Sequence, residues 1–381
     1  MNVTDQQLDN LFKSCDPATF GRAQQDVLDE SYRKAGKLDA NRFATHFSPT
    51  DVGILETVSD LLLRDRVPEK SIHLELYKLN VYGCVPVFDR MAVILMKSTG
   101  PGGFFKGHVD TPRSDTMFAS LVIVLPTVHE GGSLVIRHNG KEWTFDSSKA
   151  VNAESTPHAA FVAFFSDVEH EVLPVSSGYR VTLTYNLYLK KKNAAKRTAA
   201  IATFTQTDEG IKNALEGVCA FLPEGGILGF GLGHRYPFSQ VSTRLSNIAG
   251  CLKGTDAAIK RACDSLSIPI TIKAVYRDEY GAILLDHFAD FGYRQIDDSL
   301  LAYLKENENG LVIYNFGGRP PEEFRDNDND TYPIIWVKPL AKTNPFSSSY
   351  ISYGNEATLS YVYGEICLVA TVPPADKRVD Q

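Results

Sequence analysis

The stretch Ser166–Leu187 reads SDVEHEVLPVSSGYRVTLTYNL, and it contains two β-rich runs joined by a glycine turn. Both runs are rich in β-branched and aromatic residues, and the SSGY between them is typical of a hairpin connection. Similar short runs extend from Ser71 to Leu189, separated by turn signals such as EGGS and HNGK. Many short strands at even spacing predict a sandwich, a jelly roll or a barrel.

The regions on either side of this β-rich core have a different pattern. Before the core, apolar residues recur at helical spacing in DQQLDNLFKSC, RAQQDVLDESYRKAG and SPTDVGILETVSDLLLRD. After Lys190, helical runs such as TDAAIKRACDSLSI alternate with strand-like runs such as GLVIYNF. We therefore expect an α+β protein in three parts: a helical region over 1–66 that packs on the core, the core itself over 67–190, and an α+β C-terminal region over 191–381. The last region either shapes the substrate entrance, through loops such as GLGHRYP and YISYGNEA, or serves packing alone.

Composition and charge narrow the function classes. The 381-residue chain has 43% hydrophobic residues and a net charge of −7, which is typical of a globular protein and not of a general nucleic-acid-binding surface. Its longest apolar run, FASLVIVL, is far too short to cross a bilayer, and the polar MNVTDQQLDN lacks the apolar centre of a signal peptide. None of the six cysteines forms a C-x-x-C pair, which favours reduced thiols. We expect a cytoplasmic protein without nucleic-acid or membrane partners.

A candidate metal site begins in the stretch Lys106–Ser114, KGHVDTPRS, which holds the only H-x-D of the chain. In a strand, residues two apart point to the same face, so His108 and Asp110 would present a nitrogen and a carboxylate to one point. His170 follows about 60 residues later, which at about ten residues per strand and turn is roughly six strand–turn units. Two histidines and one carboxylate on one face leave open positions on a non-haem Fe(II) ion. The rival HLE at His73–Glu75 lacks such downstream partners, and we interpret it as structural.

Arg180 is the second unusual feature. It lies ten residues after His170 and shares a strand face with Thr182. An arginine inside a β-core is costly unless it is paired, and a carboxylate that accepts two hydrogen bonds would satisfy it. A dicarboxylate co-substrate that binds iron at one end and Arg180 at the other would account for both features.

An H-x-D, a distal His and an Arg ten residues later resemble the pattern of Fe(II)/2-oxoglutarate-dependent oxygenases. The segments FFKGHVDTPR, GGSLVIRHNGKEWTFD and SDVEHEVLPVSSGYRVTLTYNL are most similar to the prolyl-4-hydroxylase-like branch. The resemblance covers about Ser71–Leu189 and implies a double-stranded β-helix, the cupin-like jelly roll. Animal prolyl hydroxylases have Lys at the position of Arg180, so the resemblance does not carry prolyl specificity.

The resemblance also implies roles for individual residues and cofactors. Fe(II), 2-oxoglutarate and O2 would be required, and ascorbate is a candidate accessory reductant. The catalytic metal ligands that it implies are His108, Asp110 and His170, and the co-substrate residues are Arg180, Thr182 and Tyr77. Arg113 and Arg137 either line the substrate mouth or are exposed charges near turns.

The function implied by the resemblance is oxidation of an unactivated C–H bond, with release of succinate and CO2. The substrate would be an amino-acid-like small molecule or a protein residue such as proline. Related halogenases lack the carboxylate, so Asp110 argues for hydroxylation or another oxidation without halide. The alternative is a non-catalytic cupin-like binding module. A metal hydrolase or isomerase on the same fold would leave Arg180 without a role.

One segment interrupts the resemblance. In such enzymes LYKLNVYG runs almost directly into GGFFK, but here Cys84–Thr99 stands between them. The segment is either an inserted hairpin near the active-site rim or a retained intron in the gene model, since its 16 codons preserve the reading frame.

Overall fold

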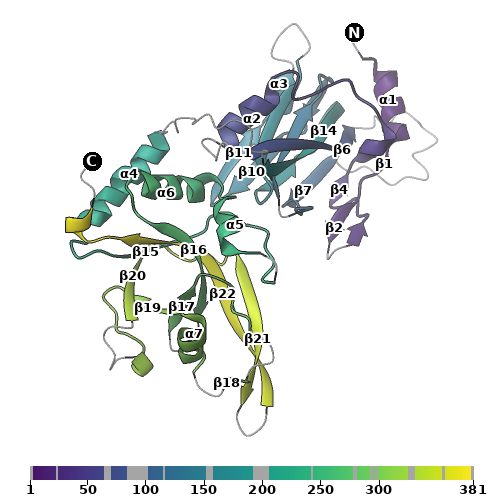
Figure 1. The fold of residues 1–381 in the computed structure, drawn as a ribbon. Helices are drawn as coiled ribbons and strands as arrows, with labels where there is room; N and C mark the ends of the chain where they lie inside the picture. Colours follow the sequence, from purple (N-terminus) through teal and green to yellow (C-terminus); the bar gives the residue numbers. More distant parts are fainter. Residues whose placement is uncertain are drawn as a thin grey trace. The chain divides into compact units, whose positions relative to one another are not determined.

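The chain divides into two compact units, Met1–Ala200 and Ile201–Gln381, drawn in purple to teal and in teal to yellow in Figure 1. The computed structural model describes residues 3–22, 25–63, 70–83, 102–114, 116–151, 158–191, 206–241, 243–277, 281–291, 295–296, 299–324, 331–353 and 357–378. The segment Cys84–Thr99, interpreted above as an insertion or an intron, lies outside these residues.

The core of the first unit consists of two β-sheets. Their strands are β1 (Asp16–Pro17), β4 (Arg33–Lys34), β5 (Gly36–Asp39), β6 (Lys70–Gly83), β7 (Phe104–His108), β8 (Met117–Val124), β9 (His129–Gly131), β10 (Leu134–His138), β11 (Lys141–Phe145), β12 (Ala160–Phe165), β13 (Glu169–Val172) and β14 (Val175–Lys191). The larger sheet has the order β1-β5-β6-β14-β8-β12, with β9 paired to β14, and the smaller has the order β11-β10-β13-β7-β4. From β6 to β14 the chain passes back and forth between the two sheets, which is the topology of a jelly roll. The strand-rich core agrees with the expected fold class.

The central strand β14 shows why the sequence adopts this arrangement. It pairs antiparallel with both β6 and β8, so both of its edges are used. Side chains alternate along a strand. Val181 and Leu183 are therefore buried on one face, whereas Arg180, Thr182 and Thr184 line the cavity at the other.

The N-terminal 66 residues are only partly helical. Helices α1 (Asp5–Ser14) and α2 (Ile54–Leu62) form where helical spacing predicts them, and a short 3-10 helix, η1, spans Ala40–Arg42. The predicted helix over RAQQDVLDESYRKAG is wrong. This stretch forms the hairpin β2 (Phe20–Arg22) and β3 (Gln25–Val27), followed by β4 and the start of β5.

Tertiary pairing explains the difference, because it overrides local helical spacing. Strand β4 adds to the edge of the smaller sheet, with Arg33 opposite Phe105, and β5 adds to the larger sheet, with Gly36 opposite Val81. A Cβ at Gly36 would lie 2.7 Å from Cβ of Cys15, so a larger residue would disturb the contact with α1.

The ends of β6 and β7 meet at a close glycine contact. The Gly103 N–H donates a hydrogen bond to the Gly83 carbonyl over 2.9 Å. A Cβ on Gly103 would lie 2.8 Å from Cα of Tyr82, so only glycine allows this approach. The residues on either side of the interrupting segment are therefore neighbours in space.

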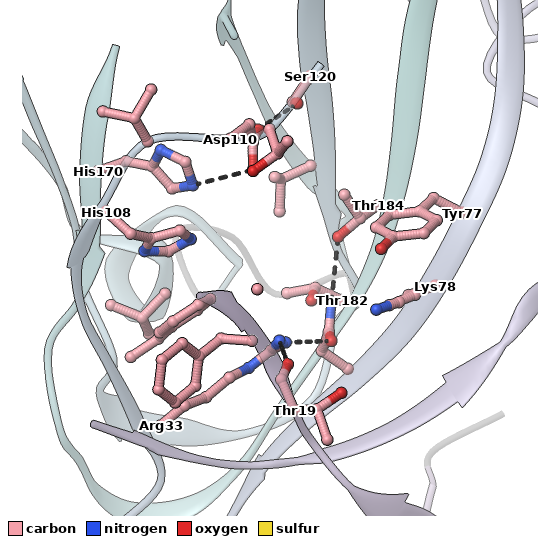
Figure 2. Close-up of a pocket in the computed structure, with 18 of the residues that line it drawn as sticks. Thr19, Arg33, Tyr77, Lys78, His108, Asp110, Ser120, His170, Thr182 and Thr184 are labelled. Atoms are coloured by element: carbon pink, nitrogen blue, oxygen red, sulfur yellow. Dashed lines mark hydrogen bonds and ion pairs between the residues drawn. The ribbon is translucent and has the colours of Figure 1, made fainter. Parts of the chain in front are cut away.

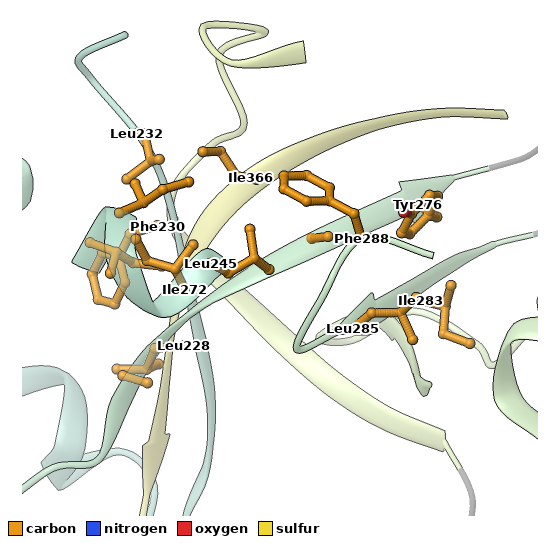
Figure 3. Close-up of a cluster of buried hydrophobic side chains, with 14 of the residues drawn as sticks. Leu228, Phe230, Leu232, Leu245, Ile272, Tyr276, Ile283, Leu285, Phe288 and Ile366 are labelled. Carbon is orange, nitrogen blue, oxygen red and sulfur yellow. The ribbon is translucent and has the colours of Figure 1, made fainter. Parts of the chain in front are cut away.

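The second unit packs helices on a mixed sheet of order β15-β20-β19-β17-β16-β22-β21-β18. Its elements are α4 (Gln206–Ala220), β15 (Gly226–Gly231), α5 (Leu245–Ala249), α6 (Gly254–Ser265), β16 (Ile270–Arg277), β17 (Ala282–Leu285), β18 (Gln295–Ile296), α7 (Leu300–Glu308), β19 (Leu311–Asn315), β20 (Thr331–Lys338), β21 (Pro345–Tyr353) and β22 (Ala357–Val372). Figure 3 shows part of its core, where Leu228, Ile272 and Ile366 of the sheet lie with Leu245 of α5. The unit mixes helices and strands, as its sequence pattern predicts.

Two further observations concern the chain as a whole. Within the described residues, no helix is long and apolar enough to cross a membrane. Four of the described cysteines, Cys15, Cys219, Cys263 and Cys367, are free thiols.

Candidate active site

A cavity of about 610 Å³ lies between the two sheets of the first unit, a volume typical of small-molecule sites. Both sheets and the N-terminal hairpin contribute to its wall. Figure 2 shows His108 and His170 on one side, Thr182 and Thr184 on the other, and Asp110 between them. The predicted metal ligands and co-substrate residues thus line one cavity.

The three predicted metal ligands come from neighbouring strands. His108 ends β7 and lies directly opposite His170 on β13, and Asp110 follows two residues after His108. Their ligand atoms all lie within 4.8 Å of one another. The His170 Nε2 and Asp110 Oδ1 atoms are 3.7 Å apart. The structure therefore brings together the set that sequence spacing predicted.

Backbone carbonyls orient both imidazoles. His108 Nδ1 lies 2.9 Å from the Lys106 carbonyl, and His170 Nδ1 lies 3.1 Å from the Val168 carbonyl. A carbonyl only accepts, so each Nδ1 carries the proton and donates it. Each Nε2 is then left with a lone pair, which is the form that binds a metal.

The carboxylate is oriented in the same way. The Ser120 hydroxyl donates to Asp110 Oδ2 over 2.5 Å, so Oδ1 is the atom that faces His170. Two neutral nitrogens and one carboxylate oxygen form a donor set that fits Fe(II) with positions left open.

The environment of His108 keeps its ring neutral. Burial and the neighbouring His170 lower the pKa of His108 to about 3. Phe105 stacks on the imidazole, with ring centroids 3.5 Å apart. A ring that stays unprotonated at neutral pH does not need to lose a proton before it binds a metal.

Arg180 lies on the opposite wall and is only 1% exposed. Its Nε donates to the Ser147 hydroxyl over 3.0 Å, while its Nη2 is buried and has no hydrogen-bond partner among the described residues. Burial lowers the pKa of this guanidinium. Within the part of the chain that the structure describes, no carboxylate forms an ion pair with Arg180. An orphaned cationic N–H that faces a cavity indicates an anionic ligand.

A short relay holds Arg180 in place. His129 Nδ1 donates to the Thr127 carbonyl over 2.7 Å, so its Nε2 accepts from the Ser147 hydroxyl over 3.1 Å. The Ser147 oxygen in turn accepts from Arg180. Burial lowers the pKa of His129, which keeps this acceptor neutral. On the other side, a Cβ on Gly132, whose φ is +68°, would lie 2.8 Å from Cδ of Arg180.

The remaining predicted residues differ in their positions. Thr182 is buried at 1% exposure and faces the cavity opposite Asn80. Tyr77 lines the cavity at a bulge of β6, and its hydroxyl is hydrogen-bonded to Arg113, whose guanidinium lies 4.5 Å from the Tyr77 ring centroid. Arg113 thus lines the mouth, as one of its two interpretations held. His73 instead lies 6.3 Å from the Tyr188 ring, outside the cavity lining.

Arg137 fits the second interpretation given for these two arginines, an exposed charge near a turn. Its guanidinium is bound by three carboxylates, with Glu142 at 2.7 Å, Glu171 at 2.9 Å and Glu169 at 3.3 Å. It is absent from the cavity lining.

Several polar residues that line the cavity or hold Arg180 in place were not predicted from the sequence. They are Arg33, Asn80, Tyr82, Ser120, His129 and Ser147. A weak signal existed for two of them, because Asn80 and Ser120 are polar residues within otherwise apolar strand runs. Arg33 carried no such signal, since its segment had the spacing of a helix.

Comparison with known proteins agrees with this geometry. The family model of the 2OG-Fe(II) oxygenase superfamily matches residues 91–188. No curated protein matches the chain. The match confirms the resemblance drawn from the sequence over these residues, which include His108, Asp110, His170 and Arg180.

Solved structures that are similar to the chain include two hydroxylases. A Pseudomonas putida prolyl-4-hydroxylase has 18% identity and a TM-score of 0.28, with 48% of this chain and 82% of that chain covered. A Trichoplax adhaerens prolyl hydroxylase, in complex with a hypoxia inducible factor peptide fragment, has 17% identity and a TM-score of 0.30, with 48% and 75% covered. A Burkholderia pseudomallei 2OG-Fe(II) oxygenase family oxidoreductase has 15% identity and a TM-score of 0.28, with 50% and 82% covered.

Proposed function

We propose that this chain, whose residues 91–188 match the 2OG-Fe(II) oxygenase superfamily, is an Fe(II)- and 2-oxoglutarate-dependent dioxygenase. One observation carries the proposal. The cavity that holds His108, Asp110 and His170 is also lined by Arg180, whose buried Nη2 has no hydrogen-bond partner among the described residues. A dicarboxylate that chelates the metal at one end would place its other carboxylate at the cation on the opposite wall, so this arrangement fits a chelating dicarboxylate.

The residues divide the work as follows. His108, Asp110 and His170 would hold Fe(II), which together with 2-oxoglutarate and O2 supplies oxidation of an unactivated C–H bond, with succinate and CO2 as products. Arg180 would bind the distal carboxylate of 2-oxoglutarate through its free N–H, and Thr182 would add a hydroxyl beside it.

The third co-substrate position has two candidates. Tyr77 lines the cavity but is engaged by Arg113, whereas Tyr82 lies directly opposite Arg180 on β6. Arg180 Cζ is 5.5 Å from the Tyr82 ring centroid, so Tyr82 also belongs to the wall around the proposed carboxylate.

The substrate class and setting are part of the proposal. We propose hydroxylation, or a related oxidation, of an amino-acid-like small molecule or of a protein residue such as proline, with ascorbate as an accessory reductant. We propose a cytoplasmic location because Cys15, Cys219, Cys263 and Cys367 are free thiols. The proposal includes no nucleic-acid or membrane partner. The role expected of the C-terminal region stays a prediction from the sequence, and one of its two loops, Tyr350–Ala357, lies partly outside the described residues.

Succinate release tests the function and separates it from a non-catalytic binding module. Protein supplied with Fe(II), 2-oxoglutarate and O2, alone and with a panel of peptides, amino acids and metabolites, is expected to form succinate. His108→Ala, Asp110→Ala and His170→Ala should each fall to the background rate and lose bound iron, because each removes one of three ligands.

The matched control is His287→Ala. This histidine lies in the second unit, 51% exposed, with its Nε2 2.8 Å from Glu308. It should keep full activity and iron content. Full activity in any of the three ligand variants would refute the assignment at that position. A folded wild-type protein that never releases succinate would favour the binding module.

A further inference from the structure

We infer that Arg33 binds an anionic group of the substrate, so that the oxidised compound carries a carboxylate close to the reacting C–H bond. The inference rests on the proposed function and deepens it. Arg33 is 7% exposed on β4 and lines the same cavity as the metal ligands. It is the second buried arginine of this cavity.

Neutral groups hold the guanidinium of Arg33. Its Nη1 donates to the Thr19 carbonyl over 2.6 Å, and its Nη2 donates to Asn80 Oδ1 over 2.9 Å. Asn80 is itself fixed, because its Nδ2 donates to the Thr184 hydroxyl over 3.2 Å. The Nε of Arg33 is buried and, among the described residues, has no hydrogen-bond partner. The cation is therefore positioned without being neutralised, a costly state that a bound anion would relieve.

Arg33 also lies beside the metal ligands. Its Cζ sits 4.3 Å from the Phe105 ring centroid, and Phe105 stacks on His108 with ring centroids 3.5 Å apart. A single aromatic ring thus separates the guanidinium from a metal-binding imidazole. A carboxylate at Arg33 would bring carbons only a few bonds away next to the metal, which is the positioning that oxidation of a C–H bond requires.

The charge of the residues that line the cavity also supports binding of an anionic group. Apart from the metal ligand Asp110, its charged lining among the described residues consists of one carboxylate and four cations: Asp26, Arg33, Lys78, Arg113 and Arg180. The chain as a whole has a net charge of −7, so this local positive excess runs against the average. The dicarboxylate co-substrate uses Arg180 and the metal. A second anion is what the other buried arginine is suited to bind.

The N-terminal hairpin keeps this wall in place. The Phe20 and Tyr32 rings have centroids 4.3 Å apart, and the Tyr32 hydroxyl donates to the Gly107 carbonyl of β7 over 3.0 Å. The segment that supplies Arg33 is thus attached to the strand that ends in His108. It is a wall of the site and not only a support of the sheet.

Pairs of probes that differ by one charge test the inference. In the first arm, free L-amino acids are compared with their amides. In the second arm, N-acetyl-Ala-Pro-Glu-amide is compared with N-acetyl-Ala-Pro-Gln-amide, which tells a free carboxylate from one on a peptide. Binding is measured by calorimetric titration of the protein with Mn(II) and 2-oxoglutarate, so that it does not depend on turnover.

In at least one arm the wild-type protein should prefer the acid by about 10- to 100-fold, the range expected of a charged hydrogen bond. Arg33→Gln should reduce that preference to about 2-fold or less, and Arg33→Lys should keep part of it. The control Arg137→Gln removes the same charge outside the cavity and should keep the wild-type preference.

A merely structural Arg33 gives a different result, because Arg33→Gln would then weaken the acid and the amide equally. That outcome, or equal binding of acid and amide by the wild-type protein in both arms, overturns the inference. Succinate formation alone and with the substrate panel described above is recorded in parallel. Its absence under all of these conditions refutes the proposed oxygenase function, whereas the acid preference reports on Arg33 alone.

Discussion

In the Ile201–Gln381 unit, each buried carboxylate of the described residues has donors within the chain, whereas in the Met1–Ala200 unit two buried arginines have no anion. Asp256 accepts from the Gly233 N–H over 2.9 Å and from the Tyr236 hydroxyl over 3.0 Å. Asp208 meets Arg261 at 2.6 Å. Arg33 and Arg180 are also buried, yet among the described residues neither has a carboxylate partner, and each keeps an N–H without a hydrogen bond.

The comparison distinguishes buried charges that stabilise the fold, such as Asp256, from buried charges suited to bind a ligand, such as Arg33 and Arg180. A buried ionic group whose partners all belong to the chain is part of the packing, and removing it destabilises the folded protein. A buried cation without a partner destabilises the fold, because no interaction offsets the free energy lost when the cation is removed from water. Its presence is best explained by a ligand that completes it. The unit with these arginines also holds the proposed metal ligands His108, Asp110 and His170.

The largest expected effect tests the unpaired side of this comparison. Arg180→Ala should raise the 2-oxoglutarate concentration needed for half-maximal succinate formation by two to four decades, because removing one partner of a buried charge pair costs about 3–5 kcal/mol. Iron content should hardly change, since Arg180 is not a ligand. Arg180→Lys should fall between, because it keeps the charge and loses the planar fork.

The same position offers a stability test. Arg180→Met replaces an unneutralised cation by an apolar chain of similar length, so the free energy of unfolding without ligands should stay within about 1 kcal/mol of wild type or rise. Denaturant unfolding followed by Trp143 fluorescence in a Trp336→Phe background measures it. A marked loss of stability, together with an unchanged need for 2-oxoglutarate, would show that Arg180 serves the fold and would break the comparison.

The paired side of the comparison predicts the opposite behaviour for Asp256. Asp256→Ala should lower the free energy of unfolding by about 3–5 kcal/mol, because it leaves the Gly233 N–H and the Tyr236 hydroxyl buried without an acceptor and removes the ion-pair partner of Lys338. The control is Asp264→Ala on the same helix, a surface residue 54% exposed beside Lys260.

That control should cost less than about 1 kcal/mol, as exposed ion pairs do. Trp336 fluorescence in a Trp143→Phe background follows the second unit in both variants. Equal stability of the two variants would show that the Asp256 network is not what holds this unit together.

The smallest expected effect sharpens the account of the metal-binding wall. Ser120→Ala removes the donor to Asp110 Oδ2 and should weaken metal binding by about 10- to 100-fold. Ser148→Ala is the matched control, because its hydroxyl also donates to an aspartate, Asp146, at 2.7 Å and is absent from the cavity lining. Mn(II) titration compares the two, and equal affinities would show that Asp110 needs no orienting partner.

The sequence predicted the site better than the surroundings of the site. His108, Asp110 and His170 were found because a metal demands particular residue types at strand spacing, and the structure brings them together. Arg180 was found because a charge inside an apolar run is unusual. Both patterns can be recognised from residues close together in the sequence, without knowledge of the tertiary contacts.

What the sequence did not predict depends on contacts between distant segments. Arg33 belongs to a stretch with helical spacing, and only its pairing opposite Phe105 makes it part of a sheet and of the cavity. His129 and Ser147 support Arg180 from loops and short elements far apart in sequence. The hydrogen-bond donors Gly233, His234 and Tyr236 lie twenty or more residues before Asp256. No local pattern carries such information, because each pairing is decided by the packing of the whole unit.

The glycine contact between β6 and β7 has a consequence for the messenger RNA. Because Gly103 N–H meets the Gly83 carbonyl at 2.9 Å, the chain leaves the first sheet and starts the second at the same place. Changing the number of residues between these two points from 19 to 3, as loss of Cys84–Thr99 would do, alters the loop-closure cost by only about 1.5 kcal/mol. A transcript with the corresponding codons and one spliced without them would therefore both encode a chain able to join β6 to β7. The two chains would share the proposed metal ligands His108, Asp110 and His170 and differ only in the length of the connection between β6 and β7.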